Sequence, residues 1–318
     1  FDGSGYGLVD GQRIKCWRSW GHGSQTLAEG VANGCNCVFM DIATTEGAGV
    51  MYDYFEKFGL FEKTGIDVVG ETKAILLKEE NVKTVDIARI GFGQAIAITP
   101  IQLARAVSGI ITGNLPTPHI VSSITDKSGK TVYNKTVEQG RQVVSSETSA
   151  KMRSLLENVV INGGGKNAGV AGFSIGGKTG TAQKYSESGG IAQGKYISSF
   201  IGFSSVENPE YLCLMIVDEP QGYEYYGSLV AAPFVSEVYA NIFAYKGVKP
   251  TYQAGQEPVE FVMPDLVGKS TSEAFAILKN LGVHYEYAGD GGNILYQMPA
   301  AGSKANSNTI AFLQLSSG

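Results

Sequence analysis

The sequence predicts an α+β fold, with helices first, then consecutive antiparallel strands, then a covering helix. Apolar residues recur at helical spacing in several segments up to about residue 162, and strand-like segments follow one another from about 170 to 218. At "GVKPTYQAGQEPVEF" prolines, glycines and polar residues interrupt the apolar pattern. We therefore predict a large domain over 1–246, a linker over 247–260 and a small domain over 261–318.

The composition is that of a globular protein, since 43% of the 318 residues are hydrophobic and 17% are charged. The net charge of -5 and the lack of any run of five Lys or Arg argue against nucleic acid as a partner. No apolar run approaches the roughly 18 residues that a membrane span needs. Because the chain opens with Phe1 and no signal peptide, we expect a piece of a longer polypeptide.

The first part of the large domain is predicted to be a hairpin followed by helices. Asp10-Gly11 is a typical turn pair between two short strands. Thr99 and Pro100 are typical of an N-cap and a first helical position, and Gly113 of a helix end. The expected elements are a hairpin over 1–17, helices over 24–42, 50–58 and 100–113, two short strands within 118–134 and a capped helix over 145–162.

The second part is predicted to be a sheet and its covering helix. The segment "YLCLMIVDE" is apolar almost throughout, which predicts a buried strand with Cys213 in the core. Trp17 and Trp20 are also expected to be packing residues. The expected elements are strands over 170–185, 197–206 and 210–218, a helix over 230–247, and in the small domain a helix over 270–281 with short strands around it.

The segment "GFSIGGKTGTAQKYSES" (172–188) crowds glycines around a Lys-Thr-Gly-Thr core. Glycine weakens a strand interior and often marks a place where a ligand or another backbone comes close. The alternative is an ordinary edge strand whose lysine discourages aggregation. The other motifs in the sequence favour the interpretation that a ligand or another backbone comes close to this segment.

Several motifs occur in a fixed order along 1–246, and together they resemble the class B penicillin-binding transpeptidases. They are "CW" and "GHG" at 16–23, the Ser-x-Asn-like tripeptide at 34–36, "GIDVVGET" at 65–72, "IGFGQAIAITPIQLA" at 90–104, "GFSIGGKTGTAQ" at 172–183 and "SFIGFSSVENPEY" at 199–211. The tail resembles a PASTA domain through "MPDLVGKSTSEAFAILKNLG" and "QMPAAGS". One such module after a class B domain resembles the sporulation branch of the family.

The resemblance implies the penicillin-binding transpeptidase fold, an antiparallel sheet with flanking helices. It implies a D,D-transpeptidase that cross-links peptidoglycan stem peptides through an acyl-serine and is inhibited by β-lactams. The implied catalytic residues are Asn36, Lys178 and Thr181, with the Thr181 N–H as an oxyanion donor. Thr179, Gly180 and Gln183 are the implied substrate-binding residues, along which a peptide adds to the strand edge.

Two family positions depart from the pattern. The first residue of Ser-x-Asn is Gly34, although Asn36 matches. Ser-x-x-Lys is absent, because no lysine has a serine three residues before it. In the family that motif precedes the Cys-Trp region, so we expect the nucleophile upstream of Phe1. The alternative to an active enzyme is a catalytically impaired protein that binds muropeptides or β-lactams or acts as a scaffold, and a D,D-carboxypeptidase is a third reading.

The resemblance also implies where the protein works and with what. Its ligands would be stem peptides and β-lactams, and a glycosyltransferase would be a partner. It would lie on the extracytoplasmic face of the bacterial cell membrane, attached only through an upstream anchor.

Cys16, His22, Cys35 and Cys37 form a C-x5-H-x12-C-x-C pattern of the ligand types that structural zinc prefers. Residues two apart on a helix point roughly 200° from each other, which argues against Cys35 and Cys37 sharing one ion. We predict a structural zinc held by Cys16, His22 and Cys35. The resemblance implies Asp2 as the fourth ligand, because related sequences carry a cysteine or carboxylate at that place, and Cys37 and Asp10 are the alternatives. A Cys16–Cys35 disulfide and unpaired buried thiols are the competing interpretations.

Overall fold

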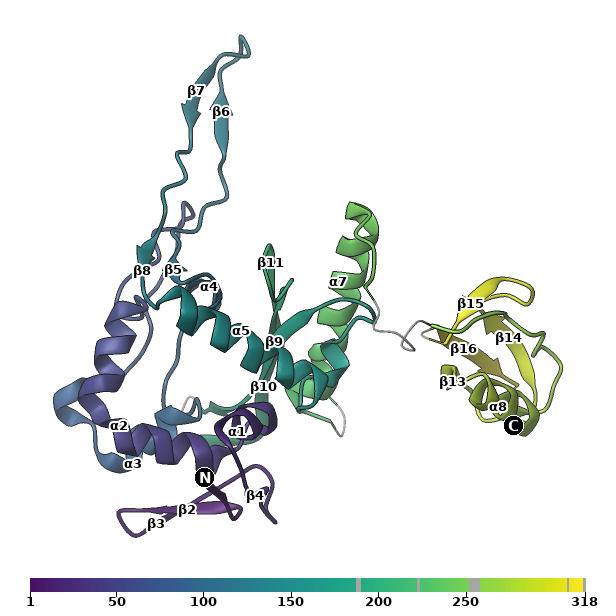
Figure 1. The fold of residues 1–318 in the computed structure, drawn as a ribbon, viewed down its shortest axis with the longest axis horizontal. Helices are drawn as coiled ribbons and strands as arrows, with labels where there is room; N and C mark the ends of the chain where they lie inside the picture. The colour runs from purple at the N-terminus through teal and green to yellow at the C-terminus, as the bar shows by residue number, and fades with distance from the viewer. Residues whose placement is uncertain (187–189, 222–223, 252–257, 308, 317–318) are drawn as a thin grey trace. The chain divides into compact units, whose positions relative to one another are not determined.

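The computed structural model describes residues 1–318 except 187–189, 222–223, 252–257, 308 and 317–318. The chain divides into two compact units, Phe1–Lys249 and Pro250–Gly318 (Figure 1). The proposed linker over 247–260 falls partly outside the described residues.

The large unit begins with short strands and two consecutive helices. The hairpin is confirmed: β2 (Tyr6–Val9) pairs with β3 (Gln12–Lys15) around a turn in which Asp10 and Gly11 both have positive φ. β1 (Asp2–Gly3) pairs with β4 (Gly23–Ser24). The two helices are α1 (Leu27–Asn33) and α2 (Asn36–Lys57).

The predicted boundary between those helices was wrong. One helix was expected over 24–42, but the chain breaks at Gly34, which caps α1 at φ 59°. The predicted gap near residue 47 is only a kink inside α2, where Gly47 has φ 79°. The break leaves Cys35 outside both helices as the N-cap of α2, which matters for the site below.

The following elements largely match expectation. α4 (Pro100–Thr112) has the Thr99 cap and ends at Gly113, and α5 (Ser146–Ile161) is capped by Ser145. α3 (Thr84–Gly91) was not predicted. The remaining elements are η1 (Glu79–Asn81), β5 (Asn114–Leu115), β6 (Ser123–Thr125), β7 (Thr131–Asn134), β8 (Arg141–Gln142) and η2 (Lys166–Ala168).

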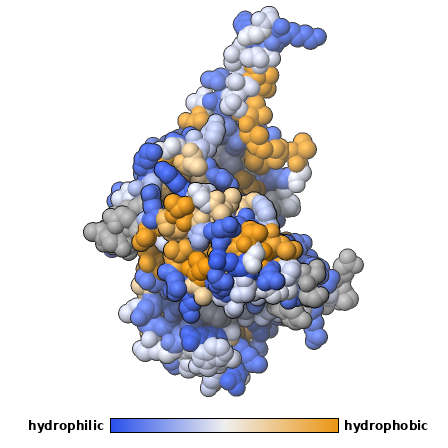
Figure 2. Space-filling model, turned by 90° about the vertical axis from the view of Figure 1, so that its right-hand side faces the viewer, coloured by the Kyte–Doolittle hydropathy of each residue, from blue (hydrophilic) through white to orange (hydrophobic). Residues whose placement is uncertain are grey.

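The β6–β7 hairpin projects from the body of this unit as a long arm (Figure 1). Hydrophobic residues gather along the lower part of the arm, whereas its tip is hydrophilic (Figure 2). Asp67 fixes the base by accepting hydrogen bonds from the Ile120 and Val121 amides, at 2.7 and 2.9 Å.

The central sheet has the order β11-β10-β9 and is antiparallel throughout. Its strands are β9 (Ile175–Tyr185), β10 (Ile191–Ser204) and β11 (Tyr211–Asp218). On β10, Phe200 packs with α7 (Ala232–Lys246), whereas Phe203 belongs to a second core cluster with residues of α4 and α5. The sheet is thus covered by helices, as the fold class predicts.

The buried strand was assigned incorrectly. β11 is only half-buried at the sheet edge, whereas β10 carries the most buried residues. Cys213 is half-buried but packs against the core cluster that contains Phe200, so its placement beside the core is confirmed. Burial follows from the place of a strand in the sheet, and the central strand has neighbours on both edges.

One described stretch, Gly227–Lys246, is long and apolar enough to cross a bilayer by length and composition alone, contrary to our expectation. It comprises α6 (Gly227–Val230) and α7. Val235 and Tyr239 of α7 are fully buried against the sheet. Its apolar face therefore serves the core of this unit.

The small unit has its own core. α8 (Thr271–Asn280) contributes Leu278, which packs with Leu266 and Leu313. β16 (Ile310–Leu315) lies between β13 (His284–Ala288), parallel to it, and β14 (Ile294–Met298), antiparallel to it. β12 (Glu260–Val262) pairs with β15 (Lys304–Asn306). The predicted helix and strands of this unit are confirmed.

Candidate active site and cysteine cluster

The Lys-Thr-Gly segment lies on β9, which is one of the two edge strands of the sheet. Lys178, Thr179 and Gly180 face Ile201, Phe200 and Ser199 of β10. The opposite edge of β9 has no strand paired with it among the described residues. An extended peptide could add to that edge by backbone hydrogen bonds.

The glycines around this segment make room for the protein's own side chains. A Cβ at Gly176 would lie 2.3 Å from the Phe203 ring, and one at Gly177 2.6 Å from the Phe200 ring. A Cβ at Gly180 would lie 2.5 Å from Ser199 Oγ. The three glycines therefore make room for side chains of β10, and the approach of a ligand to this strand stays a prediction.

Lys178 is a partly buried cation without a carboxylate partner in the part of the chain that the structure describes. Its ammonium lies 3.3 Å from both the carbonyl oxygen and the hydroxyl of Thr179. Burial disfavours the charged form and lowers the pKa of Lys178 to about 8.

Gly34 stands directly opposite that ammonium. A Cβ on Gly34 would lie 3.1 Å from Lys178 Nζ. Asn36, the first residue of α2, donates instead from Nδ2 to the carbonyl of Lys15 at 3.2 Å. The structure therefore brings the first position of the altered Ser-x-Asn tripeptide beside Lys178.

The other end of the segment is fixed by α6. The Gly227 N–H donates to Thr181 Oγ1 at 3.1 Å. Because that oxygen accepts from the protein, the Thr181 hydroxyl proton is free to point elsewhere. Gln183 is exposed on the same strand, opposite Tyr196 of β10.

We call the surroundings of Lys178 and Thr181, which the Gly34 turn and Gly227 contact, the cleft. Three cysteines gather beside the Gly34 turn. The sulfurs of Cys16, Cys35 and Cys37 all lie within 4.8 Å of one another, and all three side chains are buried free thiols. The helix argument against Cys37 was wrong, because Cys35 is the extended N-cap of α2 and not a helical residue. Cys37 therefore joins the cluster and was missed as a main candidate.

The other predicted zinc ligands, His22, Asp2 and Asp10, differ in their position relative to the three sulfurs. His22 Nδ1 lies 3.8 Å from Cys16 Sγ, and His22 Nε2 is buried without a hydrogen-bond partner. Asp2 and Asp10 are exposed and are not among the residues whose ligand atoms gather at the cluster. His22 is likewise outside the group of gathered ligand atoms, which comprises the three thiols, although its Nδ1 lies beside Cys16. Three thiols with an adjacent imidazole are donor types that fit zinc.

The cluster is electrostatically asymmetric. A hydrogen bond from the Cys16 thiol lowers the pKa of Cys35 and raises that of Cys16. Burial raises the pKa of Cys37. Cys35 is therefore the sulfur that most readily becomes a thiolate, the form that binds metal.

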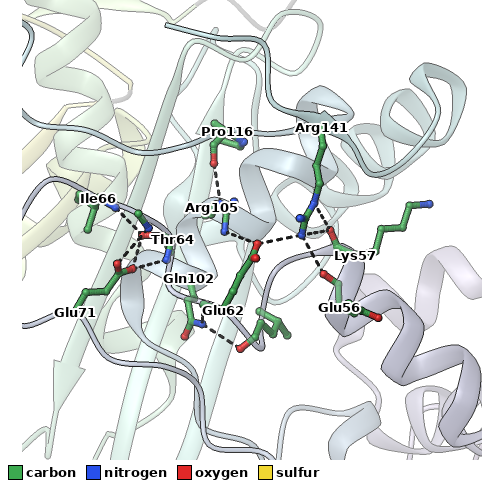
Figure 3. A network of polar contacts seen from close by, with 12 residues as sticks. Glu56, Lys57, Glu62, Thr64, Ile66, Glu71, Gln102, Arg105, Pro116 and Arg141 are labelled. Atoms are coloured by element: carbon green, nitrogen blue, oxygen red, sulfur yellow. Dashed lines mark hydrogen bonds and ion pairs between the residues drawn. The ribbon is translucent and has the colours of Figure 1, made fainter. Parts of the chain in front are cut away.

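Two of the other family motifs build a scaffold near the base of the arm. Figure 3 shows the Glu62 carboxylate between the guanidinium groups of Arg105 and Arg141. It also shows the Glu71 carboxylate, which accepts a hydrogen bond from the Thr64 N–H. Buried Gln102 donates to the carbonyls of Leu60 and Glu62 at 3.1 and 2.9 Å. The motifs at 65–72 and 90–104 therefore hold loops and contribute structure.

We expect Gln102→Met to lower the free energy of unfolding by about 2 kcal/mol, because it leaves two carbonyls without their donor. Chemical denaturation with urea measures this. Gln139→Met, at an exposed position, is the control and should change stability by less than about 0.5 kcal/mol. Equal effects of the two changes would contradict the structural role of Gln102.

Comparison with known proteins identifies the class. Residues 1–240 match the Penicillin binding protein transpeptidase domain family, and 261–317 match the PASTA domain family. The chain belongs to the penicillin-binding protein transpeptidase family and carries a PASTA domain.

Two relatives show which members of this family the chain is similar to. The chain is 39% identical over 312 residues to Stage V sporulation protein D of Bacillus subtilis, covering 96% of this chain and 48% of that protein. It is 30% identical over 206 residues to the probable peptidoglycan D,D-transpeptidase PenA of Neisseria meningitidis, covering 64% of this chain and 34% of that protein. The chain thus spans half or less of the length of these relatives.

Solved structures agree on the fold. The transpeptidase domain of penicillin-binding protein 3 from Burkholderia pseudomallei matches with a TM-score of 0.68 at 27% identity, covering 79% of this chain and 73% of that one. Penicillin-binding protein 3 from Mycobacterium tuberculosis, complexed with ampicillin, matches with a TM-score of 0.71 at 23% identity, covering 80% and 58%.

Proposed function

We propose that the longer protein is a peptidoglycan D,D-transpeptidase, with its nucleophilic serine and the partner lysine upstream of Phe1. The observation that carries this is Lys178, a partly buried cation beside Gly34 on an open strand edge. Family membership of 1–240 supports the assignment.

In this mechanism a stem peptide adds to the open edge of β9. The serine attacks the carbonyl between two D-alanines, D-alanine leaves, and an amine of a neighbouring stem attacks the acyl-enzyme. The Thr181 amide would help to stabilise the oxyanion. The Thr179 and Thr181 hydroxyls would meet the substrate carboxylate, Gln183 would extend that binding surface, and β-lactams would acylate the same serine.

Three chain residues would prepare the cleft for this reaction. Lys178 supplies positive charge, and its lowered pKa makes proton transfer near neutral pH accessible. Asn36 would assist from the start of α2, although its amide here donates to Lys15. Gly34 removes the hydroxyl that family members place opposite the lysine, so proton transfer would depend more directly on Lys178.

The place of action follows from the proposed substrate. Cross-linking of stem peptides occurs outside the cytoplasmic membrane, so an anchor upstream of Phe1 would hold the protein at that face. The glycan strands would come from a glycosyltransferase partner.

A structural zinc is part of the proposal. Cys16, Cys35 and Cys37 would hold it with His22 as the fourth ligand, and Asp2 becomes the weaker candidate. When bound, the metal would fix the β2–β3 hairpin to the start of α2. The Cys16–Cys35 disulfide is the competing arrangement and would exclude the metal.

A second function has one observation in its favour. Gly34 in place of serine would suit a protein that binds stem peptides without turning them over. Incubating the longer protein with a D-Ala-D-Ala stem peptide and measuring released D-alanine separates the two. Catalytic release supports the enzyme, whereas stoichiometric binding without release supports the binding or scaffold protein.

Gly34→Ser should lower stability by about 1 kcal/mol, because φ 59° disfavours residues with a side chain. It should also raise the acylation rate, since the new hydroxyl would lie against Lys178. Gly129→Ser is the control, because Gly129 has φ 82° in an open turn without neighbours. A Gly34→Ser protein that acylates no faster than wild type would show that glycine is no handicap here.

A further inference from the structure

Trp17 connects the cysteine cluster to the neighbouring cleft. It follows Cys16 directly, and its ring meets the His22 ring edge-on with centroids 5.2 Å apart. Its Nε1–H lies 3.2 Å from the carbonyl oxygen of Asn33 and 3.1 Å from that of Gly34. These carbonyls belong to the turn that faces Lys178.

The same ring also contacts the segment that hydrogen-bonds to Thr181. The Trp17 and Tyr226 rings meet edge-on with centroids 6.1 Å apart. Tyr226 leads into Gly227, whose N–H donates to Thr181 Oγ1. Tyr225, the neighbour of Tyr226, stacks on Tyr196 of β10 at 4.0 Å. This side of the contact is therefore fixed to the sheet.

Trp17 and Trp20 were both expected to be packing residues, and that was wrong. Trp17 is 53% exposed and Trp20 is 78% exposed. The Trp20 ring makes a cation–π contact with Arg18 at 5.3 Å. Trp17, although half-exposed, contacts three separate segments.

We infer that Trp17 is a positioning residue that joins the cysteine cluster to the two segments that border the cleft. Its N–H holds the Asn33–Gly34 turn, and its ring holds the Tyr226–Gly227 segment that fixes Thr181. Because Cys16 adjoins Trp17 and His22 touches it, metal binding at the cluster would be felt at both segments. The last point rests on the proposed zinc site.

The test is amide hydrogen exchange on the 318-residue chain, read at Gly34 and Gly227, with thiols reduced and metal removed. Trp17→Leu should speed exchange about tenfold at both amides, and Trp20→Leu should change neither. Trp17→Phe should restore protection at Gly227, where only the ring is needed, but not at Gly34. The Phe200 amide of β10 should stay unchanged in every variant.

Equal effects of the two leucine variants, or faster exchange that extends to Phe200, would overturn the inference. This result does not depend on metal or on catalysis, so it stays separate from a failure of the transpeptidase or zinc proposals. Adding zinc should then slow exchange at Gly227 in wild type but not in Trp17→Leu. Stoichiometric zinc binding that leaves wild-type Gly227 unchanged would overturn the coupling.

Discussion

Replacing Lys178 by alanine is expected to abolish penicillin acylation of the longer protein. The ammonium lies between Gly34 and the Thr179 hydroxyl, and no other cation of the described residues contacts them. Loss of one preorganised electrostatic group in such a site costs about 10²–10³-fold in rate. Time-resolved labelling with a fluorescent penicillin measures this.

Two further variants test whether the loss of labelling comes from the charge of Lys178. Lys184→Ala changes a lysine on the same strand that pairs with Asp218 and Glu219, and it should leave labelling within about twofold of wild type. Lys178→Met keeps the volume without the charge. Undiminished labelling of either Lys178 variant would contradict the assignment of the cleft.

The pH dependence of stability shows whether a Lys178 variant loses labelling because it loses acylation chemistry or because it unfolds. The pKa of Lys178 is about 8 in the folded chain and 10.5 as its ordinary value, so the unfolded chain binds more protons between these pH values. Stability therefore rises with pH through this window, and the cost of the buried charge is full below pH 8. Lys178→Met should consequently not lower the melting temperature at pH 7.

Removing the cysteine cluster should have the second largest effect. Cys16→Ser should release one zinc per chain and lower the melting temperature by about 10 °C. At a free zinc concentration of about 100 times its Kd, bound zinc stabilises the folded chain by about 2.7 kcal/mol, and the variant loses that free energy. Cys37→Ser should behave alike, because its sulfur belongs to the same cluster. Elemental analysis and thermal unfolding with and without a chelator measure both effects.

Cys213→Ser is the matched control, because Cys213 lies on β11 outside the cluster. It should keep the zinc. A wild-type protein that binds no metal and gains no stability from zinc would end the metal proposal. A mass lower by two hydrogens after oxidation, with Cys16 and Cys35 linked, would favour the disulfide.

Much of the fold could be predicted because its signals are local. The Asp10-Gly11 turn, the Thr99-Pro100 cap and the Ser145 cap are set by neighbouring residues, and all three are confirmed. The break at Gly34 was missed, since a glycine inside an apolar helical pattern is compatible both with a helix end and with a helix interior.

The site was predicted less completely, because it depends on contacts between segments that are distant in the sequence. The Lys-Thr-Gly strand was found from its residue types, but the gathering of Cys37 depends on Cys35 being an N-cap. Trp17 was predicted to be a packing residue, because size and hydrophobicity do not reveal that its N–H and ring contact other segments at the surface. A capping role for Cys35 could have been suspected from the glycine before it.

The most direct test of the central claim is the intact mass of the purified longer protein, with and without benzylpenicillin. We predict one added penicillin per chain in wild type and none in Lys178→Ala. A folded wild-type protein that carries Ser-x-x-Lys and gains no mass would contradict the transpeptidase assignment.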